Sequence, residues 1–410
     1  MFNTKAMEIK DFIKNLNQFT QDEIGQWLQA VKTNGMDEKE VSALTLAMAQ
    51  SGVILSWNGL EPTVDKHSTG GIGDKITLLF VPLIAAYGIN IPKLSGRSLG
   101  ITGGTIDKLE SISGLKTNLS IEQIKEQVQK IGLAVCSASS DLTPADKKLY
   151  AIRDVTNTID SIPLIASSIM SKKIAGGAQN IILDVKFGSG AFMKTLEDAR
   201  LLAKTMVSIG KNLNKDIKAV ISNMNQPLGY AVGNSLEIKE ILEVLSGKEV
   251  ADLTEIVLCL AKEAIRMINP SVDEKKLRDI LLGGAALKKF KEMIIAQGGD
   301  LKTQLKNANH IEIVKSKVDG YINNIDAFII GEVVHALGAG RTNINDQIDY
   351  SVGIVFHKKY GDKVKIGDSI LEIHAKSKED SIIAKRKLSS AVKFEQKAPL
   401  KLELIKEIIK

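Results

Sequence analysis

The chain has 410 residues, of which 44% are hydrophobic and 25% are charged, and this composition excludes a disordered or collagen-like protein. The net charge of +6 is small for such a length, and only 4% of the residues are aromatic, so side chains that stack on bases are scarce. We therefore expect two or three globular domains and no nucleic-acid partner.

Neither a membrane segment nor an export signal is visible in the sequence. The longest apolar run, residues 76–87, is shorter than the roughly 18 residues of a membrane span and is interrupted by Pro82. The first residues include Glu8 and lack the apolar core of a signal peptide. Cys136 and Cys259 lie in apolar stretches, which predicts buried reduced thiols rather than a disulfide or metal site. We expect a cytoplasmic protein without a membrane partner.

The first 65 residues are predicted to be helical. Thr20 and Glu23 form a capping box ahead of an apolar pattern at helical spacing, and Asn34 and Gly35 follow that pattern as a stop signal. Asp37 is the expected N-cap of a second helix, which should end near Gly52.

From residue 65 onward the pattern alternates between helices and strands. Helices are predicted over 74–87, 120–131 and 196–209, and strands over 89–94, 133–136, 181–186 and 218–221. This alternation favours an α/β fold whose sheet is covered by helices. Residues 235–300 are mostly helical in pattern, and the chain becomes β-rich after about residue 345. The last part is similar to the hairpins of lipoyl-type carriers, but it has no lysine at the expected turn, so a structural role is predicted.

Residues 65–77 combine three glycines, hydroxyl groups at 68, 69 and 77, and Lys66, just before a predicted helix. Backbone N–H groups of such a loop can turn inward and form an anion cradle at the helix N-terminus. The spacing fits neither a P-loop nor a dinucleotide-binding fingerprint. The alternative is a glycine-rich turn that binds nothing. The polar neighbours of His67 predict that this histidine is exposed.

Residues 93–110 follow a predicted strand and are also rich in glycine and hydroxyl groups, so the two loops together favour one phosphate site. A third segment, residues 153–173, contains Arg153 and the run from Ser167 to Lys173. If a helix begins near Ser168, then Ser168 and Lys172 lie four residues apart on one face and can bind a polar planar ligand. The alternative for Lys172 and its neighbour Lys173 is a solvated helix face.

These segments closely resemble the thymidine and pyrimidine-nucleoside phosphorylases, in the motifs KHSTGGIGDK, SGRSLGITGGTIDKLES and RDVTNTIDSIPLIASSIMSKK. The resemblance covers essentially the whole chain. It implies a homodimer with a small all-helical domain, a large α/β domain with a central mixed sheet, and a β-rich C-terminal part. The expected bounds are 1–65 for the helical domain, joined by about 159–190; 66–158 and 191–340 for the phosphate-binding domain; and 341–410 for the C-terminal α+β domain.

The resemblance also assigns site residues. It implies catalytic roles for His67, Arg153 and Lys172, and makes these three together with Ser168 the nucleoside ligands. Two positions depart from the family pattern, which usually has glycine at Ser98 and a bulkier side chain at Ile101. Phosphate ligands are expected at Lys66, Ser68, Thr77, Lys93, Ser95 and Thr105.

A structural potassium ion is implied by the same resemblance. Most of its ligands would be backbone carbonyls, with Glu240 as the only carboxylate. The alternative is that Glu240 pairs with a lysine of its own helix. The expected potassium ligands are Gly73, Lys75, Leu228, Ala231 and Glu240.

The predicted activity is reversible phosphorolysis of uridine, deoxyuridine and thymidine to the free base and a pentose 1-phosphate. Lys93 is expected beside the pentose, because it lies two residues before Ser95 on one strand. The alternatives are a strict thymidine phosphorylase, a nucleoside-binding protein without turnover, and a phosphoribosyltransferase. The last would need Mg²⁺ on paired carboxylates, whereas Asp184 stands alone in its strand.

Overall fold

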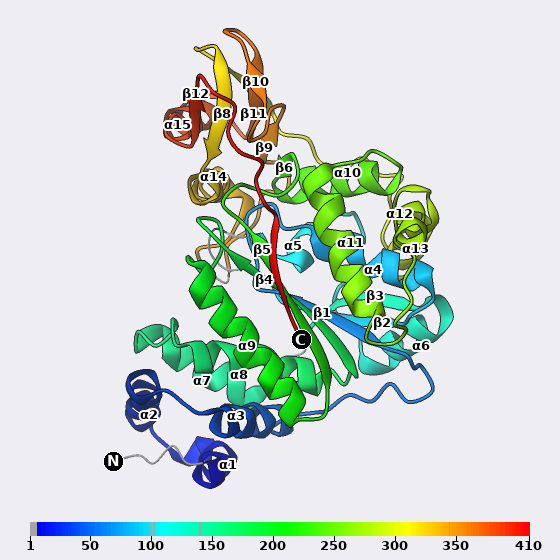
Figure 1. The fold of residues 1–410 in the computed structure, drawn as a ribbon, viewed down its shortest axis with the longest axis vertical. Coiled ribbons are helices and arrows are strands. Elements are labelled where there is room, and N and C mark those ends of the chain that lie inside the picture. Colours follow the sequence, from blue (N-terminus) through cyan, green and yellow to red (C-terminus); the bar gives the residue numbers. More distant parts are fainter. Residues whose placement is uncertain (1–5, 98–100, 102, 139–141, 344) are drawn as a thin grey trace.

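A computed structural model describes residues 6–97, 101, 103–138, 142–343 and 345–410, with helices at the N-terminal end, a sheet in the middle and a β-rich part at the other end (Figure 1). This architecture confirms the predicted fold class. No helix in the described part of the chain has the length and apolar character needed to cross a membrane.

The helical layer is built from α1 (Ala6–Lys14), α2 (Gln21–Asn34), α3 (Glu38–Gln50), α7 (Pro144–Val155) and α8 (Ile162–Ala175), with a 3₁₀ turn at Leu16–Gln18. The predicted capping box of Thr20 and the predicted N-cap Asp37 are confirmed. Trp27, Leu44 and Leu149 share one buried cluster, which joins α7 to the first helices. Residues 144–175 therefore contribute α7 and α8 to this layer, and the predicted domain bounds remain a proposal.

The central sheet has the strand order β1 (Val64–Ser68), β4 (Asn180–Phe187), β5 (Asp216–Asn223) and β13 (Ile405–Ile409). The first three are parallel and β13 is antiparallel, which confirms a mixed sheet. Every residue of β4 is buried, as expected for a central strand covered on both faces. A parallel pair, β2 (Ile91–Ser95) and β3 (Leu133–Ser137), adjoins β1 through a bridge between Thr63 and Asn90.

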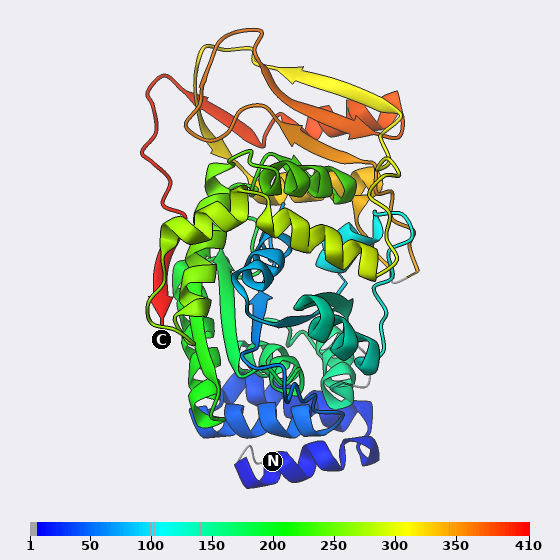
Figure 2. The ribbon, with the colours of Figure 1, turned by 90° about the vertical axis from the view of Figure 1, so that its right-hand side faces the viewer.

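Helices cover both faces of the sheet (Figures 1 and 2). On one side α9 (Leu196–Asn212) packs against β5 and α8. On the other side, Phe80, Ile182 and Phe290 belong to the largest buried cluster. Helix α4 (Ile76–Tyr87) supplies an unbroken run of buried residues to this side. The remaining helices of this domain are α5 (Thr105–Glu110), α6 (Ile121–Ile131), α10 (Asn234–Leu245), α11 (Ala251–Ile265), α12 (Glu274–Leu282) and α13 (Ala285–Ala296).

The β-rich part contains two small sheets, of strand order β6-β9-β11-β7 and β10-β8-β12. The predicted β-rich character after about residue 345 is confirmed, and β13 leaves this part to run back along the central sheet (Figures 1 and 2). The elements are β6 (Ala231–Val232), β7 (His310–Lys315), β8 (Gly320–Ile325), α14 (Ala327–Val334), a π-helical turn at His335–Ala339, β9 (Gly353–Phe356), β10 (Lys363–Val364), β11 (Ser369–Ala375), α15 (Lys378–Leu388) and β12 (Val392–Glu395).

Both cysteines are free, as predicted. Cys136 is fully buried in β3, whereas Cys259 in α11 is only partly buried. Burial raises the pKa of the Cys136 thiol to about 12 and that of Cys259 to about 11, so neither forms a thiolate readily at neutral pH.

Candidate functional site

The three motif segments meet at one cavity of about 490 Å³, beside the carboxyl ends of β1 and β2. Ligands of open α/β sheets commonly bind at this edge. Seven of the predicted site residues line the cavity: His67, Ser68, Thr77, Lys93, Ser95, Thr105 and Lys172. The convergence of segments so far apart in the sequence makes this cavity the candidate active site.

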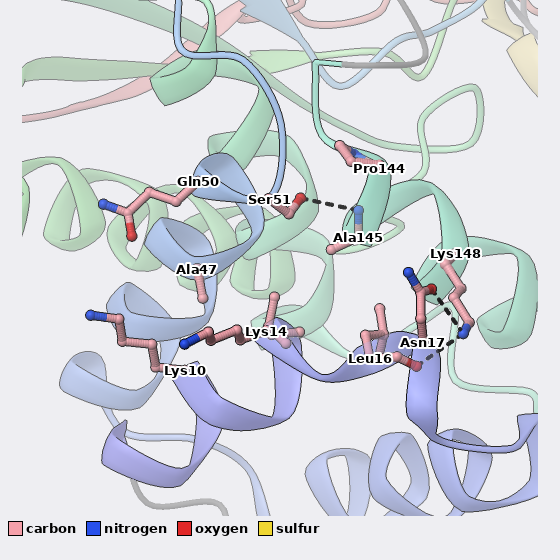
Figure 3. Close-up of a pocket in the computed structure, with 11 residues that line it drawn as sticks. Lys10, Lys14, Leu16, Asn17, Ala47, Gln50, Ser51, Pro144, Ala145 and Lys148 are labelled. Carbon is pink, nitrogen blue, oxygen red and sulfur yellow. Dashed lines mark hydrogen bonds between the residues drawn. The ribbon is translucent and has the colours of Figure 1, made fainter.

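Another cavity, of about 390 Å³, lies in the helical layer between α1, α3 and α7 (Figure 3). Lys10, Lys14 and Lys148 surround it, and Lys148 already donates to the backbone oxygen of Leu16 at 2.9 Å. None of the described residues that line it belongs to the three motif segments. We therefore assign it no part in the predicted chemistry.

Hydroxyl groups and glycine backbone form one wall of the candidate site. Ser68 Oγ donates to Asp74 Oδ2 at 2.5 Å and accepts from the Gly70 backbone N–H at 3.2 Å. Gly70 has a φ of +85°, a conformation that favours glycine. The hydroxyls of Ser95 and Thr105 complete this wall. It offers several neutral donors to an anion.

Lys66 does not line the cavity, contrary to the expectation that its charge lies within the cradle. Its side chain is fully buried behind Thr77, where Nζ donates to Thr77 Oγ1 at 3.1 Å and lies 3.4 Å from Asp184 Oδ2. Lys186 Nζ lies 2.9 Å from the same carboxylate oxygen. Burial, opposed by the attraction of Asp184, lowers the pKa of Lys66. Asp184 thus pairs with two lysines.

A second buried charge group connects β1, β2 and α8. Lys173 Nζ lies 2.8 Å from Asp65 Oδ2, and Lys93 Nζ lies 3.7 Å from Asp65 Oδ1. Burial and the proximity of Lys173 hold the pKa of Lys93 well below its usual value. Lys93 and Ser95 line the same cavity, as strand alternation predicted. The roles of Asp65 and Lys173 were missed, although both residues directly adjoin predicted ligands.

Lys172 also lines the cavity. Its Nζ pairs with Asp146 and donates to Ser168 O at 3.0 Å and Ser168 Oγ at 3.1 Å. Ser168 and Lys172 therefore share one face of α8, as predicted, although the helix begins six residues before Ser168. Ser168 reaches the cavity only through Lys172. Asp146, on α7, is a further residue that the sequence reasoning missed.

Arg153 is buried away from the cavity. Its guanidinium donates to three backbone oxygens, those of Thr158 at 3.4 Å, Ile159 at 2.7 Å and Leu164 at 3.0 Å. In this conformation the guanidinium binds the segment that connects α7 to α8, and its N–H groups do not face a ligand. Arg153 does not line the cavity in this conformation, and its predicted contact with a nucleoside remains a prediction.

His67 is partly buried rather than exposed, and its Nε2 atom has no hydrogen-bond partner among the described residues. Burial, together with the positive charges of Lys173, Lys93, Lys66 and Lys172, lowers the pKa of His67 well below 6.5. The imidazole is neutral at pH 7 and can donate a hydrogen bond. This environment favours donation of a hydrogen bond by a neutral imidazole over transfer of a proton from an imidazolium.

The low pKa of His67 predicts how stability depends on pH. Between its folded pKa and about 6.5 the unfolded chain binds more protons, so the free energy of unfolding rises with pH in this window. We expect His67→Gln to reduce this slope by up to about 1.4 kcal/mol per pH unit. Urea unfolding at pH 5, 6 and 7 measures it, and an unchanged slope would contradict the low pKa.

Two family models match the chain. A glycosyl transferase family a/b domain covers residues 60–287, and a pyrimidine nucleoside phosphorylase C-terminal domain covers residues 321–395. The chain is 46% identical to the pyrimidine-nucleoside phosphorylase of Staphylococcus haemolyticus (strain JCSC1435), over 95% of this chain and 93% of the relative. It is 47% identical to that of Staphylococcus epidermidis (strain ATCC 12228 / FDA PCI 1200), over 96% and 94%.

This chain belongs to the pyrimidine-nucleoside phosphorylase family. The predicted family is confirmed. A crystal structure of anthranilate phosphoribosyltransferase from Thermus thermophilus has a TM-score of 0.59 and 16% identity, over 72% of this chain and 95% of that one. At this identity the likeness concerns the fold alone.

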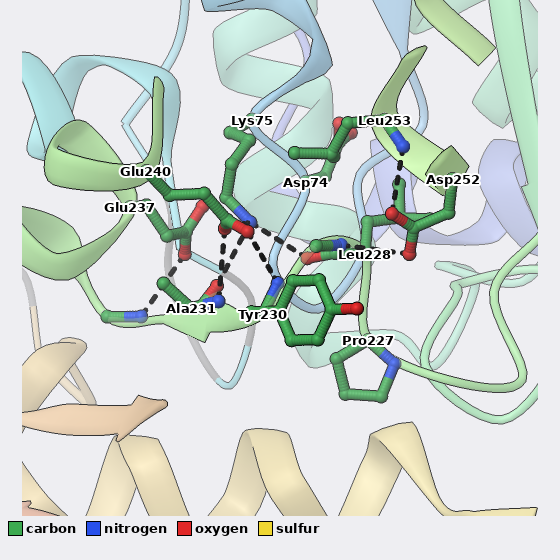
Figure 4. Close-up of polar contacts among 12 residues, drawn as sticks. Asp74, Lys75, Pro227, Leu228, Tyr230, Ala231, Glu237, Glu240, Asp252 and Leu253 are labelled. Carbon is green, nitrogen blue, oxygen red and sulfur yellow. Dashed lines mark hydrogen bonds and ion pairs between the residues drawn. The ribbon is translucent and has the colours of Figure 1, made fainter. Parts of the chain in front are cut away.

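The five residues expected to hold potassium come together, but their geometry does not fit a free ion. The Lys75 side chain points into the group, and its Nζ donates to Leu228 O at 2.8 Å and Ala231 O at 3.0 Å (Figure 4). Glu240 Oε2 lies 2.9 Å from the same nitrogen. A lysine ammonium therefore occupies the oxygen ligands that the prediction gave to the ion. Glu240 pairs with a lysine, but not with one of its own helix.

The two departures from the family pattern have different outcomes. Ser98 lies outside the described residues. Ile101 is partly buried and packs against the core of the β-rich part, and its backbone oxygen would lie 3.4 Å from a Cβ on Gly331. In this member of the pyrimidine-nucleoside phosphorylase family, Ile101 thus contacts the C-terminal part.

Proposed function

We propose that the chain catalyses reversible phosphorolysis of a pyrimidine nucleoside to the free base and a pentose 1-phosphate. One observation carries the proposal: a single cavity is lined by hydroxyl groups and glycine backbone together with Lys172 and His67, whose Nε2 has no partner among the described residues. The names of the staphylococcal relatives support the same activity.

The hydroxyl wall suits inorganic phosphate. Ser95 and Thr105 donate hydrogen bonds to its oxygens, Ser68 can do so once its hydroxyl turns away from Asp74, and Lys93 and Lys173 lie on one side. A phosphate oxygen held in this way attacks the anomeric carbon, forming a C–O bond as the bond from carbon to the base nitrogen breaks. The bonding electron pair leaves with the base. Positioning supplies much of the rate, since phosphate is a weak nucleophile.

Lys172 and His67 serve the departing base. The ammonium of Lys172 stabilises the negative charge that develops on the pyrimidine, and the neutral imidazole of His67 donates a hydrogen bond to a base carbonyl. Asp146 holds Lys172 in place before the substrate arrives. The base anion then takes up a proton from solvent, so that no covalent enzyme intermediate is needed.

Incubation of the purified protein with uridine and phosphate tests the proposal, with chromatography to detect uracil and ribose 1-phosphate. We expect both products in equal amounts and only when phosphate is present. Uridine binding without uracil release would favour a binding protein. Consumption of uracil only with a phosphoribosyl diphosphate and Mg²⁺ would favour a phosphoribosyltransferase.

We further propose that the enzyme accepts uridine, deoxyuridine and thymidine, whereas cytidine is poor because its amino group reverses the hydrogen-bonding pattern at Lys172. We assign to Lys93 the acceptance of both ribose and deoxyribose nucleosides. Its amine is buried beside the cavity and can hydrogen-bond a 2′-hydroxyl, which a thioether largely cannot. The alternative is a strict thymidine phosphorylase.

Lys93→Met is expected to move the kcat/KM ratio of uridine to deoxyuridine toward deoxyuridine by about tenfold, the loss of one hydrogen bond of roughly 1.4 kcal/mol. Steady-state kinetics with both nucleosides measures the ratio. Phosphate KM in the same variant serves as the control for damage to the phosphate wall. An unmoved ratio would remove Lys93 from sugar recognition.

Family membership also leads us to propose a homodimer and a cytoplasmic role in pyrimidine salvage. Light scattering on the purified chain tests the dimer. A monomer at micromolar concentration would contradict it.

A further inference from the structure

The Lys75 ammonium is held as a small ion would be. Its side chain is fully inaccessible to solvent, and its three N–H groups match three acceptors, the carbonyls of Leu228 and Ala231 and the carboxylate of Glu240. Glu240 is fixed in turn, because it accepts from the backbone N–H groups of Tyr230 at 2.6 Å and Ala231 at 3.0 Å. Figure 4 shows the contacts from Leu228, Ala231 and Glu240 meeting at Lys75 Nζ.

These oxygens form the hard ligand set that suits a monovalent or divalent metal ion. Ammonium and potassium have the same charge and similar size, so one can take the place of the other. Burial opposes the charge of Lys75, but the attraction of Glu240 and Glu237 outweighs it and raises the pKa of this lysine. The group therefore remains a cation at neutral pH.

The surrounding backbone is packed closely around this cation. A Cβ on Gly229 would lie 2.6 Å from Glu240 Oε2 and 2.8 Å from Lys75 Nζ, and one on Gly73 would lie 2.6 Å from Leu228 O. A free ion cannot share these ligands with the ammonium, because the space is filled and the two charges repel. The carbonyls of Leu228 and Ala231 and the carboxylate of Glu240 can therefore bind either Lys75 or a free ion, but not both.

The cation joins segments that matter for the cavity. Lys75 follows Asp74, which binds Ser68 of the hydroxyl wall, and directly precedes α4. The turn that it binds, residues 227–231, also receives Lys359 from the β-rich part, which donates to Pro227 O at 2.5 Å and Gly229 O at 2.7 Å. Two lysines thus bind alternate carbonyls of one turn and connect it to different parts of the fold.

We propose that Lys75 is a covalently tethered monovalent cation, which fixes the 227–231 turn against the hydroxyl loop and makes this protein independent of free potassium. The proposal concerns stability and cation binding, and it stands apart from the proposed reaction.

The first test compares the wild-type protein in potassium chloride and in choline chloride at equal ionic strength. Melting temperature is the primary readout and phosphorolysis the second. We expect the same melting temperature within about 1 °C and the same rate in both salts. A saturable rise with potassium, absent with choline, would overturn the proposal.

The second test removes the tether. Lys75→Ser leaves the carbonyls and Glu240 without their cation, and the melting temperature in choline should fall by roughly 5–10 °C, as expected for an unpaired buried charge. Potassium or ammonium chloride should restore about half of this loss, because each ion refills the site. Lithium, which is smaller and more strongly hydrated, should restore less.

A double variant keeps the test informative if Lys75→Ser folds poorly. Lys75→Met with Glu240→Gln fills the space with uncharged groups of similar volume, so its melting temperature should not differ between potassium and choline. If Lys75→Ser gains nothing from potassium or ammonium beyond the effect of choline, either in melting temperature or in refolding yield, the tethered-cation proposal is wrong. Because these readouts do not need turnover, they stay separate from the activity assay.

Discussion

Replacing Lys172 by methionine is expected to lower kcat/KM for uridine phosphorolysis by about 10²- to 10³-fold, which is roughly 2.7–4 kcal/mol of transition-state stabilisation. Methionine keeps most of the side-chain volume but cannot stabilise the charge on the departing base. Since that charge develops only as the bond breaks, kcat should fall more than KM rises. Initial rates over a range of uridine concentrations measure both constants.

Two further variants make this result specific. Asp146→Asn keeps Lys172 but loosens its position, so we expect a smaller loss, of about tenfold. Lys248→Met removes a largely exposed lysine paired with Glu243 and should leave the rates unchanged. A Lys172→Met enzyme within a factor of three of wild type would show that Lys172 does not stabilise the leaving base.

Lys66→Met is expected to reduce the free energy of unfolding by about 3–5 kcal/mol, because it leaves a fully buried carboxylate group with too little positive charge. Asp184 would then keep Lys186 as its ion-pair partner, and the group of Asp184, Asp74 and Lys186 would lose one positive charge behind the phosphate wall. We therefore also expect a higher phosphate KM. Urea unfolding and phosphate-dependent kinetics measure the two effects.

The matched control is Lys66→Met combined with Asp184→Asn, which restores the balance of charge. This double variant should recover part of the lost stability. If stability falls but phosphate KM stays at the wild-type value in the single variant, Lys66 is a structural residue and not part of phosphate binding.

Local signals in the sequence identified the elements that position the site. The capping residues Thr20 and Asp37 correctly marked helix starts, and Gly35 correctly marked the end of α2. Such signals act within one helical turn, so they can be recognised without the tertiary structure. The loops that line the cavity were found in the same way, from the clustering of glycine and hydroxyl residues.

Side-chain direction and burial could not be obtained from these local signals. The environment of His67 depends on lysines at 93, 172 and 173, which meet it only through the packing of β1, β2 and α8. Arg153 lies in a predicted ligand segment, yet its guanidinium binds backbone oxygens that become available only once the α7–α8 connection is folded. Lys75 illustrates the same limit, since its position was predicted and the role of its side chain was not.

The antiparallel pairing of β13 with β5 has a consequence for how this chain is made. β5 ends at Asn223 and β13 begins at Ile405, so the whole β-rich part is synthesised before its neighbour strand can reach the sheet. Until then the outer edge of β5, with the buried residues Ala219 and Ile221, is an open template for pairing with another nascent chain. On a polysome, aggregation of nascent chains would begin at this edge. A chaperone would therefore protect the chain most while residues 224–404 are being translated.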